Sequence, residues 1–265
     1  MRVVSWNMAY WSHRRHHEQA WRWIIDELSP DVLLVQEAVI PEWVQRRWGV
    51  HWTRAYETGR QPWGTGLVTS CAFEPARVPA LDDWFRSIPA SVPGNPAKAG
   101  IHQADNWFAC AHVELPRIGR TLLGSVHSPS FPIERSRLRG VDVSAMKLKR
   151  NPDLWFLDVL FHFLRPRLGQ RLVVGGDFNA SRLLDTTLGE RGNNEFFDRI
   201  GDEGFVSLHR LFHDADERTY FKLGRAPHQL DYLYADAPAA ATCRACTVHP
   251  CGDLSDHAAL VADFA

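Results

Sequence analysis

The sequence predicts a fold of the α/β or α+β class with layered sheets. Short runs rich in β-branched and large apolar residues alternate with helical stretches from one end of the chain to the other. The runs expected to form strands cover residues 3–6, 32–35, 67–69, 108–115, 121–126, 172–174, 230–234 and 258–264. Such an alternation is typical of sheets that bury one face against helices.

Three helices are expected between these strands. Apolar side chains recur at helical spacing over residues 21–28, and Pro30 ends that segment. Similar periodicity predicts helices over residues 153–165 and 194–203. The first helix is preceded by a basic cluster, which we interpret as a solvated helix entrance: His13, Arg14, Arg15, His16 and His17.

One long stretch shows little periodicity. Residues 75–106 are rich in Pro, Gly and Ala, which predicts an irregular excursion in the middle of the chain. Long excursions of this kind often act as lids over functional sites.

Length and composition favour a single domain over residues 1–265. Of the 265 residues, 45% are hydrophobic, and layered folds of this size often form one domain. The 30 basic and 31 acidic side chains nearly cancel, so any nucleic acid or membrane must be bound by a local patch. No run approaches the roughly 18 apolar residues that span a bilayer.

The expected location is the cytoplasm. The first ten residues lack the apolar core of a secretion signal. Five cysteines, an odd number, fit a reducing compartment. Cys243, Cys246 and Cys251 are spaced like part of a metal knuckle, but a fourth ligand is missing, so zinc is not favoured there.

Polar side chains able to bind a metal or move a proton stand at the ends of the apolar runs. These residues are Asn7, Glu37, His127, Asp177, Asn179, Asp256 and His257. A single Asp or Asn at a strand end is usually a turn residue. Strand ends of layered sheets converge in space, however, so the joint occurrence predicts one site.

The segments around these residues resemble the ordered motifs of the endonuclease/exonuclease/phosphatase superfamily. They read VVSWN, DVLLVQE, VHSPS, VVGGDFNA, QLDYLY and LSDHAAL, in that order over nearly the whole chain. GDFN and SDH together are specific, whereas WN or QE alone would not be. The resemblance implies a four-layer α/β/β/α sandwich with two central, mostly antiparallel sheets.

The resemblance also implies a metal and proton-transfer machinery. Glu37 would be the main carboxylate on a divalent metal, with Asn7 beside it and Asp256 reaching the ion directly or through water. A set of oxygen ligands suits Mg²⁺ or Mn²⁺. His257 would act as general base or as an imidazole facing the phosphate, and Asp231 would orient it.

The same motifs imply a site for the scissile phosphate. Asp177 would orient or deprotonate the attacking water, and the Asn179 amide would contact a non-bridging oxygen. A protonated His127 would stabilise charge. A histidine at this strand end is similar to the deoxyribonuclease-like, two-histidine branch rather than the apurinic branch. Gln229 departs from the Arg or Lys that many relatives carry, which puts a phosphate contact there in doubt.

The segment after His127 is basic and favours a polyanionic substrate. Its positive residues are Arg135, Arg137, Arg139, Lys147, Lys149 and Arg150. The first three are candidate substrate contacts. Aromatic residues in other loops are candidates for stacking on bases: Trp11, Trp63 and Trp107.

The favoured function is a Mg²⁺-dependent phosphodiesterase that cleaves DNA or RNA by in-line attack of water. One alternative is a phosphatase acting on small-molecule or lipid phosphates, which would release phosphate and leave polymers intact. The other is a non-catalytic binding scaffold on the same fold.

Overall fold

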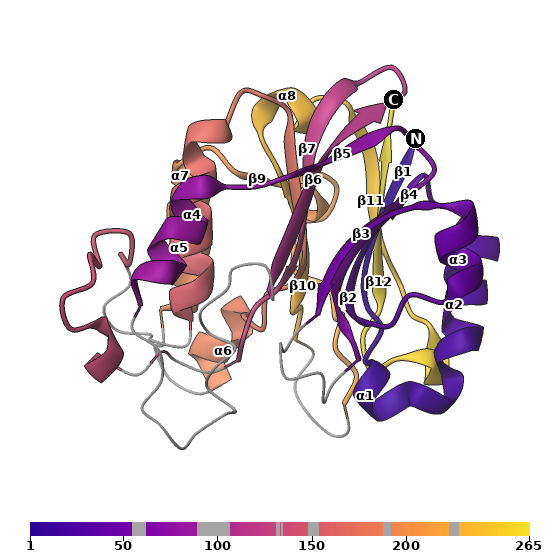
Figure 1. The fold of residues 1–265 in the computed structure, drawn as a ribbon, viewed down its shortest axis with the longest axis horizontal. Helices are drawn as coiled ribbons and strands as arrows, with labels where there is room; N and C mark the ends of the chain where they lie inside the picture. The colour runs from indigo at the N-terminus through magenta and orange to yellow at the C-terminus, as the bar shows by residue number, and fades with distance from the viewer. Residues whose placement is uncertain are drawn as a thin grey trace.

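The computed structural model describes residues 1–54, 62–88, 107–130, 133, 135–147, 154–187, 192–222 and 228–265. Within these residues, two six-stranded sheets pack face to face, and helices cover both outer faces (Figure 1). This arrangement is the four-layer α/β/β/α sandwich that the sequence analysis predicted.

The first sheet has the strand order β11-β12-β1-β2-β4-β3. Its strands are β1 (Arg2–Asn7), β2 (Val32–Ala38), β3 (Gly49–Arg54), β4 (Gly64–Thr69), β11 (Cys243–His249) and β12 (Ala259–Phe264). β1 and β2 run parallel, and the other neighbours are antiparallel. The central strands are buried along nearly their whole length, as expected for a sheet covered on both faces.

The second sheet has the order β5-β6-β7-β8-β10-β9. Its strands are β5 (Phe73–Ala76), β6 (Phe108–Leu115), β7 (Gly119–His127), β8 (Leu172–Asp177), β9 (Val206–Ser207) and β10 (Asp231–Ala235). Again one pair, β7 and β8, is parallel and the rest are antiparallel. Both sheets are therefore mostly antiparallel, as predicted.

The α-helices form the two outer layers. They are α1 (Tyr10–His13), α2 (His17–Asp26), α3 (Glu42–Arg47), α4 (Pro79–Ser87), α5 (Trp155–Leu164), α6 (Arg182–Thr187), α7 (Asn193–Asp202) and α8 (Ala237–Ala240). Figure 1 shows α2 and α3 beside the first sheet and α4, α5 and α7 beside the second. The helices predicted over 21–28, 153–165 and 194–203 correspond to α2, α5 and α7. In the described part of the chain, no helix is long and apolar enough to cross a membrane.

Three apolar cores hold the layers together. Leu34 and Leu123 belong to the core between the two sheets. Trp21 packs in the core under α2, and Phe156 and Phe161 pack in the core under α5. Each fully buried side chain of this size stabilises the fold by roughly 1.5–3 kcal/mol before cavity terms. Layers packed this tightly fix the strand ends relative to one another.

Part of the predicted irregular excursion is regular. Its described beginning forms the end of β5 and all of α4, while residues 89–106 lie outside the described residues. Pro79 occupies the first turn of α4, where a missing N–H costs nothing, and Leu81 and Phe85 are fully buried on one helical face. The high Pro and Gly content concealed this short amphipathic pattern.

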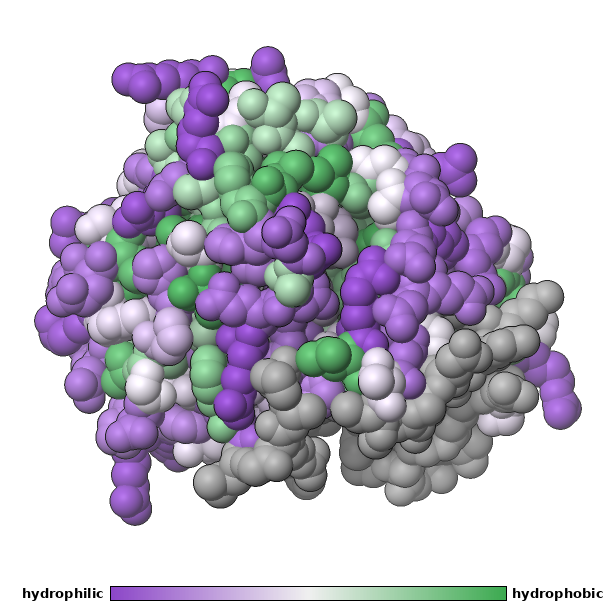
Figure 2. Space-filling view, turned by 180° about the vertical axis from the view of Figure 1, so that it is seen from behind, coloured by the Kyte–Doolittle hydropathy of each residue, from purple (hydrophilic) through white to green (hydrophobic). Residues whose placement is uncertain are grey.

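The surface is of mixed polarity. Figure 2 shows hydrophilic residues over most of the rear face, with smaller apolar areas between them. The large hydrophobic side chains that are exposed among the described residues include Trp11, Leu211 and Phe212.

Candidate active site

Strand register brings the predicted residues to one end of the sandwich. In the second sheet, His127 of β7 is the register partner of Asp177 in β8, and Asp177 is the partner of Asp231 in β10. In the first sheet, Asn7 ends β1 opposite Gln36 of the parallel β2. α1 and α6, which follow β1 and β8, lie at this end in Figure 1, and both chain termini lie at the other.

The two sheets meet through direct side-chain contacts. Asn7 Nδ2 donates a hydrogen bond to Asp177 Oδ2 at 2.9 Å and lies 3.4 Å from Glu37 Oε1. His127 Nε2 lies 3.3 Å from Glu37 Oε1 and 4.0 Å from Asp177 Oδ2. The Asn7–Asp177 and His127–Glu37 contacts cross from one sheet to the other, so the site forms only when the two sheets are correctly stacked.

Asp231 holds the ring of His257. The Nδ1 atom of His257 lies 2.9 Å from Asp231 Oδ2, so this nitrogen carries a proton and donates a hydrogen bond to the carboxylate. The other ring nitrogen, Nε2, lies 4.0 Å from Asp177 Oδ2. Trp6 Nε1 donates to the His257 carbonyl at 2.9 Å, and the Tyr220 ring lies against the imidazole. The ring is therefore fixed with Nε2 toward Asp177.

Asn179 completes the cage around Asp177. Its backbone N–H donates to Asp177 Oδ1 at 2.8 Å, and its side-chain amide donates to the Ser128 carbonyl at 2.8 Å. Asn179 has a φ of 48° and Glu37 a φ of 44°, both in the left-handed region. Such non-glycine conformations cost roughly 1–3 kcal/mol each and persist where the surroundings impose them. At Glu37 the strand register also shifts, a device that re-aims a side chain at the end of a strand.

Burial and neighbouring charges set the protonation of Asp177 and His257. Burial raises the pKa of Asp177 to about 6, with Asp231 adding to the rise while His257 and His127 oppose it. For His257, burial favours the neutral ring, but Asp231 and Asp177 outweigh it and raise the pKa to about 10. At neutral pH the site thus holds an imidazolium next to a carboxylate that can exchange a proton.

Glu37 and His127 form a second charged pair. Burial favours the neutral acid, but the hydrogen bond and charge of His127, with His257 and Asn7, outweigh it and lower the pKa of Glu37. Burial likewise favours neutral His127, yet Glu37 and Asp177 raise its pKa. Glu37 is therefore held ionised although it is largely enclosed.

The residues present fit a hard divalent cation. Glu37 Oε2 and Asp231 Oδ1 are buried and have no hydrogen-bond partner among the described residues. A buried carboxylate oxygen without a donor favours a cation. Asp177, Asp231 and His257 also offer ligand atoms that all lie within 4.8 Å of one another. The dominance of oxygen donors suits Mg²⁺ or Mn²⁺.

Two of the predicted metal residues play other parts in the geometry. The Asn7 amide nitrogen faces Glu37 and Asp177 while its oxygen accepts from the Ala9 N–H at 2.9 Å, so the side chain holds the two carboxylates in place. Within the described residues, the half-buried Asp256 carboxylate makes no hydrogen bond or ion pair. Direct metal contacts from Asn7 and Asp256 stay predictions.

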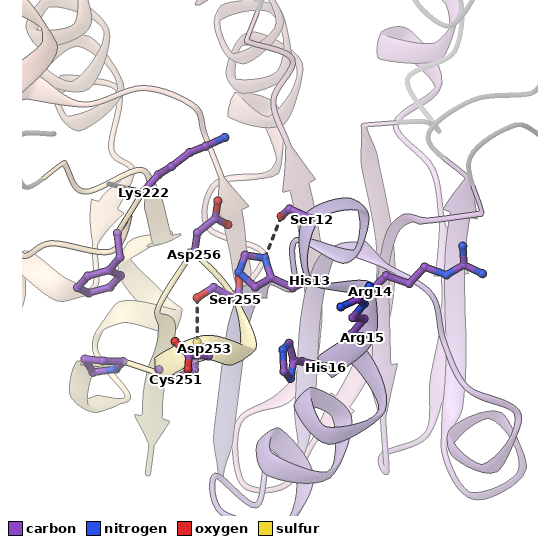
Figure 3. A pocket seen from close by; sticks show the side chains of 13 residues that line it. Ser12, His13, Arg14, Arg15, His16, Lys222, Cys251, Asp253, Ser255 and Asp256 are labelled. Carbon is purple, nitrogen blue, oxygen red and sulfur yellow. Dashed lines mark hydrogen bonds between the residues drawn. The ribbon is translucent and has the colours of Figure 1, made fainter. Parts of the chain in front are cut away.

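Asp256 instead lines a groove of about 980 Å³ beside the site. Figure 3 shows Ser12 to His16 on one side, with Lys222, Cys251, Asp253, Ser255 and Asp256 on the other. The lining contains five basic or titratable cationic side chains, which are His13, Arg14, Arg15, His16 and Lys222.

The basic cluster before α2 is therefore part of a groove as well as a helix entrance. Of its members, only His17 is buried, and it bonds the Val39 carbonyl. The sequence pattern favoured a solvated helix entrance here over a binding site. Because the cluster follows Asn7 closely in the sequence, a position beside the site could have been predicted for it.

The basic segment after His127 is less uniformly accessible than expected. Arg139 is exposed, whereas Arg137 is buried and turned away from solvent. The side chain of Arg135 lies outside the described residues, as do Lys149 and Arg150. Substrate contacts from Arg135 and Arg139 stay predictions, and the burial of Arg137 does not fit that role.

The three candidate stacking residues separate into two kinds. Trp63 and Trp107 are buried and pack on the His127 ring, with centroid distances of 5.7 Å and 5.5 Å. Trp11 is 59% exposed, with Lys222 Nζ 5.3 Å from its ring centroid. Of the three, only Trp11 is therefore exposed to solvent.

The Gln229 side chain acts inside the fold. It donates to the Asp231 carbonyl at 3.1 Å and accepts from the Glu217 N–H at 2.9 Å, and it is buried. Where many relatives carry a basic residue, this chain thus has a glutamine that links the start of β10 to Glu217.

A family model described as the Endonuclease/Exonuclease/phosphatase family matches residues 4–257. The chain belongs to this family. Its members are metal-dependent phosphoester hydrolases, and the match spans every residue of the site described above. The predicted superfamily and enzyme class are confirmed.

Solved structures share the fold over the whole chain. The 3′ phosphatase NExo from Neisseria, bound to a product DNA hairpin, is 17% identical over 100% of this chain and 99% of that chain, with a TM-score of 0.64. An AP endonuclease from Archaeoglobus fulgidus gives the same four values. The AP endonuclease LMAP from Leishmania major is 14% identical over 98% and 86% of the two chains, with a TM-score of 0.68. No curated protein matches the sequence.

Proposed function

We propose that this protein is a Mg²⁺-dependent phosphodiesterase that cleaves DNA or RNA and belongs to the two-histidine branch of the family. The observation that carries the proposal is the position of Asp177. Its Oδ2 atom lies 4.0 Å from Nε2 of both His127 and His257, and the Asn7 and Asn179 N–H groups hold the carboxylate between them. Two charged imidazoles on either side of a carboxylate fit in-line attack on a phosphodiester.

The side chains divide the reaction between them. Asp177, with a pKa of about 6, orients the attacking water and accepts its proton as the new P–O bond forms. His257 is cationic at neutral pH and faces the phosphate, so it stabilises the developing charge and can supply a proton to the leaving oxygen as its bond to phosphorus breaks. The raised pKa favours this acid role over that of general base.

The second imidazole and the amide complete the phosphate contacts. His127 adds positive charge on the other side of Asp177, and the Asn179 amide lies within reach of the same centre. A divalent ion held by Glu37, with Asn7 and Asp256 nearby, would supply further charge neutralisation to the phosphate oxygens.

A polymeric substrate is supported by the groove beside the site. Basic side chains line it from His13 to His16 and at Lys222, and Trp11 is exposed near Lys222. A polyanion with stackable bases matches this combination of charges and an aromatic ring. The related NExo structure, bound to a DNA hairpin, adds support from the same fold.

The test is a substrate panel with matched variants. Single- and double-stranded DNA and RNA are incubated with Mg²⁺ or Mn²⁺, and with a chelator. We expect metal-dependent cleavage that falls by about 100-fold or more in Asp177→Asn, His257→Ala and Glu37→Gln, with unchanged far-UV circular dichroism. Asp202→Asn, an exposed carboxylate on α7, is the control.

Each other outcome points away from the nuclease. Release of inorganic phosphate from small or lipid phosphates, with polymers left intact, would instead support the phosphatase. Polymer binding without turnover in any metal would support a scaffold.

A further inference from the structure

A second cluster of metal-binding side chains lies outside the active site. It consists of His209 in the 3₁₀ helix His209–Leu211, together with His213 and Glu217, at successive four-residue spacings. One ligand atom from each residue lies within 4.8 Å of the others. The mechanism above uses none of these three residues.

The hydrogen bond of His213 prepares it for metal binding. Its Nε2 lies 2.8 Å from the carbonyl oxygen of Cys246 in β11. Because a carbonyl only accepts, Nε2 carries the proton, and the lone pair stands on Nδ1. Metal-bound histidines typically donate their other ring N–H to a carbonyl or carboxylate in this way.

His209 and Glu217 are spaced like two ligands of one ion. His209 Nε2 and Glu217 Oε2 form a long hydrogen bond of 3.4 Å, against the usual 2.7–3.2 Å of an N–H···O hydrogen bond. A tetrahedral Zn²⁺ with bonds of about 2.0–2.2 Å separates its ligand atoms by about 3.4 Å. His209 is 1% exposed, and its Nδ1 has no hydrogen-bond partner in the described part of the chain.

The rings of His209 and His213 are stacked, so one of them must turn before both can bind the same ion. Their centroids are 4.2 Å apart and their planes differ by 13°. One ring must turn about its Cβ–Cγ bond for both lone pairs to converge. The Glu217 side chain is 50% exposed, which gives an ion a route from solvent.

We propose that His209, His213 and Glu217 form a zinc site separate from the catalytic metal. Two imidazoles and one carboxylate suit Zn²⁺, whereas Mg²⁺ favours oxygen donors. Three protein ligands leave a fourth position for water.

The ion would stabilise the segment that supports Asp231 and His257. Glu217 N–H donates to Gln229, and two residues later Thr219 Oγ1 accepts from the Asp231 N–H at 3.1 Å. Tyr220 then forms a β-bridge with His257. Zinc at Glu217 would therefore anchor the segment that holds Asp231 and His257 in position.

The test measures zinc binding rather than turnover. Chelator-treated protein carrying Glu37→Gln, which weakens the catalytic metal site, is titrated with Zn²⁺ by calorimetry. We expect binding of one zinc equivalent at this cluster and a rise in the thermal midpoint. Glu217→Gln and His213→Gln, each in the same background, should lower the affinity at least about tenfold.

Asp214→Asn is the matched control, because it removes an exposed carboxylate from the same loop without removing a ligand. Co²⁺ gives an independent readout, since a tetrahedral site with nitrogen ligands produces visible absorption that Glu217→Gln should abolish. The proposal is overturned if no zinc binds, or if Glu217→Gln and His213→Gln bind zinc as tightly as Asp214→Asn. Glu217→Gln alters an exposed side chain, so its failure to bind cannot be traced to loss of the fold.

Discussion

His127 and His257 flank the same carboxylate but are held in different ways. Trp63 and Trp107 pack on the His127 ring, whereas His257 donates Nδ1–H to Asp231. Of the two carboxylates near His257, Asp231 is a stronger electrostatic partner than Asp177. It is the main reason that His257 stays protonated well above neutral pH although burial opposes its charge.

Asp231→Asn should lower the pKa of His257 sharply. The amide keeps the shape but removes the negative charge, so that only Asp177 and Asp256 still oppose the effect of burial, which favours the neutral ring. We expect the alkaline limb of kcat/KM to move to lower pH by at least about one unit, which corresponds to about 1.4 kcal/mol. The His257 ring resonances in an NMR titration should move in parallel.

The same substitution changes stability with a defined sign. A raised folded-state pKa stabilises the protein fully below the unfolded value near 6.5, and this contribution is lost as the pH rises through about 10. Asp231→Asn should flatten that loss in urea melts between these pH values, while Asp202→Asn should not. An unshifted His257 titration would show that Asp231 does not set its charge.

The motifs and the strand ends predicted the site residues but not the side chains that pack around them. Asp177 and His257 were predictable because each stands next to an apolar run. The contacts of Trp63 and Trp107 with His127 arise from loops and strands that are distant in sequence. Local periodicity carries no information about such contacts.

Among the elements, β8 is tightly constrained at Gly176. Gly176 has a φ of 150°, and a Cβ built there would lie 1.8 Å from the Val126 carbonyl oxygen of β7. The parallel pairing makes these two residues register partners, so neither backbone can withdraw without breaking the ladder. Asp177 follows directly, and its position depends on this close approach.

Gly176→Ala should therefore destabilise the protein by at least about 2 kcal/mol, since both the backbone angle and the contact oppose a methyl group. Gly201→Ala is the control. This glycine is in α7, and nothing lies within 4 Å of the place that an alanine Cβ would occupy, so the change should be neutral or stabilising by up to about 1 kcal/mol. Urea melts followed by tryptophan fluorescence measure both. Equal stabilities for the two variants would refute the steric argument.

The strands that the sequence failed to predict lie at the edges of the two sheets. β3 and β5 are edge strands, and β5 is only partly buried, so it shows no clean apolar pattern. Pro75 lies within β5, where an edge strand tolerates a missing N–H. Central strands such as β1 and β8 are buried over almost their whole length and contain apolar runs, so they were predicted readily.

Across the whole molecule, the relative position of the two sheets decides whether the site forms. A polar link crosses the interior close to it. Gln36 Nε2 donates to Ser125 Oγ at 2.9 Å, and Ser125 Oγ donates to the Val35 carbonyl at 3.1 Å. Gln36 directly precedes Glu37, and Ser125 is two residues before His127. The link thus sets the spacing between the strands that present the Glu37 and His127 pair.

Removing the Gln36–Ser125 hydrogen bond should affect stability and turnover differently. Ser125→Ala leaves the buried Gln36 amide with one partner fewer and should cost about 1–3 kcal/mol, whereas Gln36→Met with Ser125→Ala should cost less than the sum of the single changes. The double variant has no unpaired polar group at the link, yet nothing then fixes the sheet spacing there, so its metal-dependent turnover should stay below that of the wild type. Urea melts and turnover assays of the four proteins complete the cycle, with Ser87→Ala, whose hydroxyl bonds its own helix at Trp84, as the control. Strict additivity of the two stability changes, or full turnover in the double variant, would mean that the apolar core alone aligns the sheets.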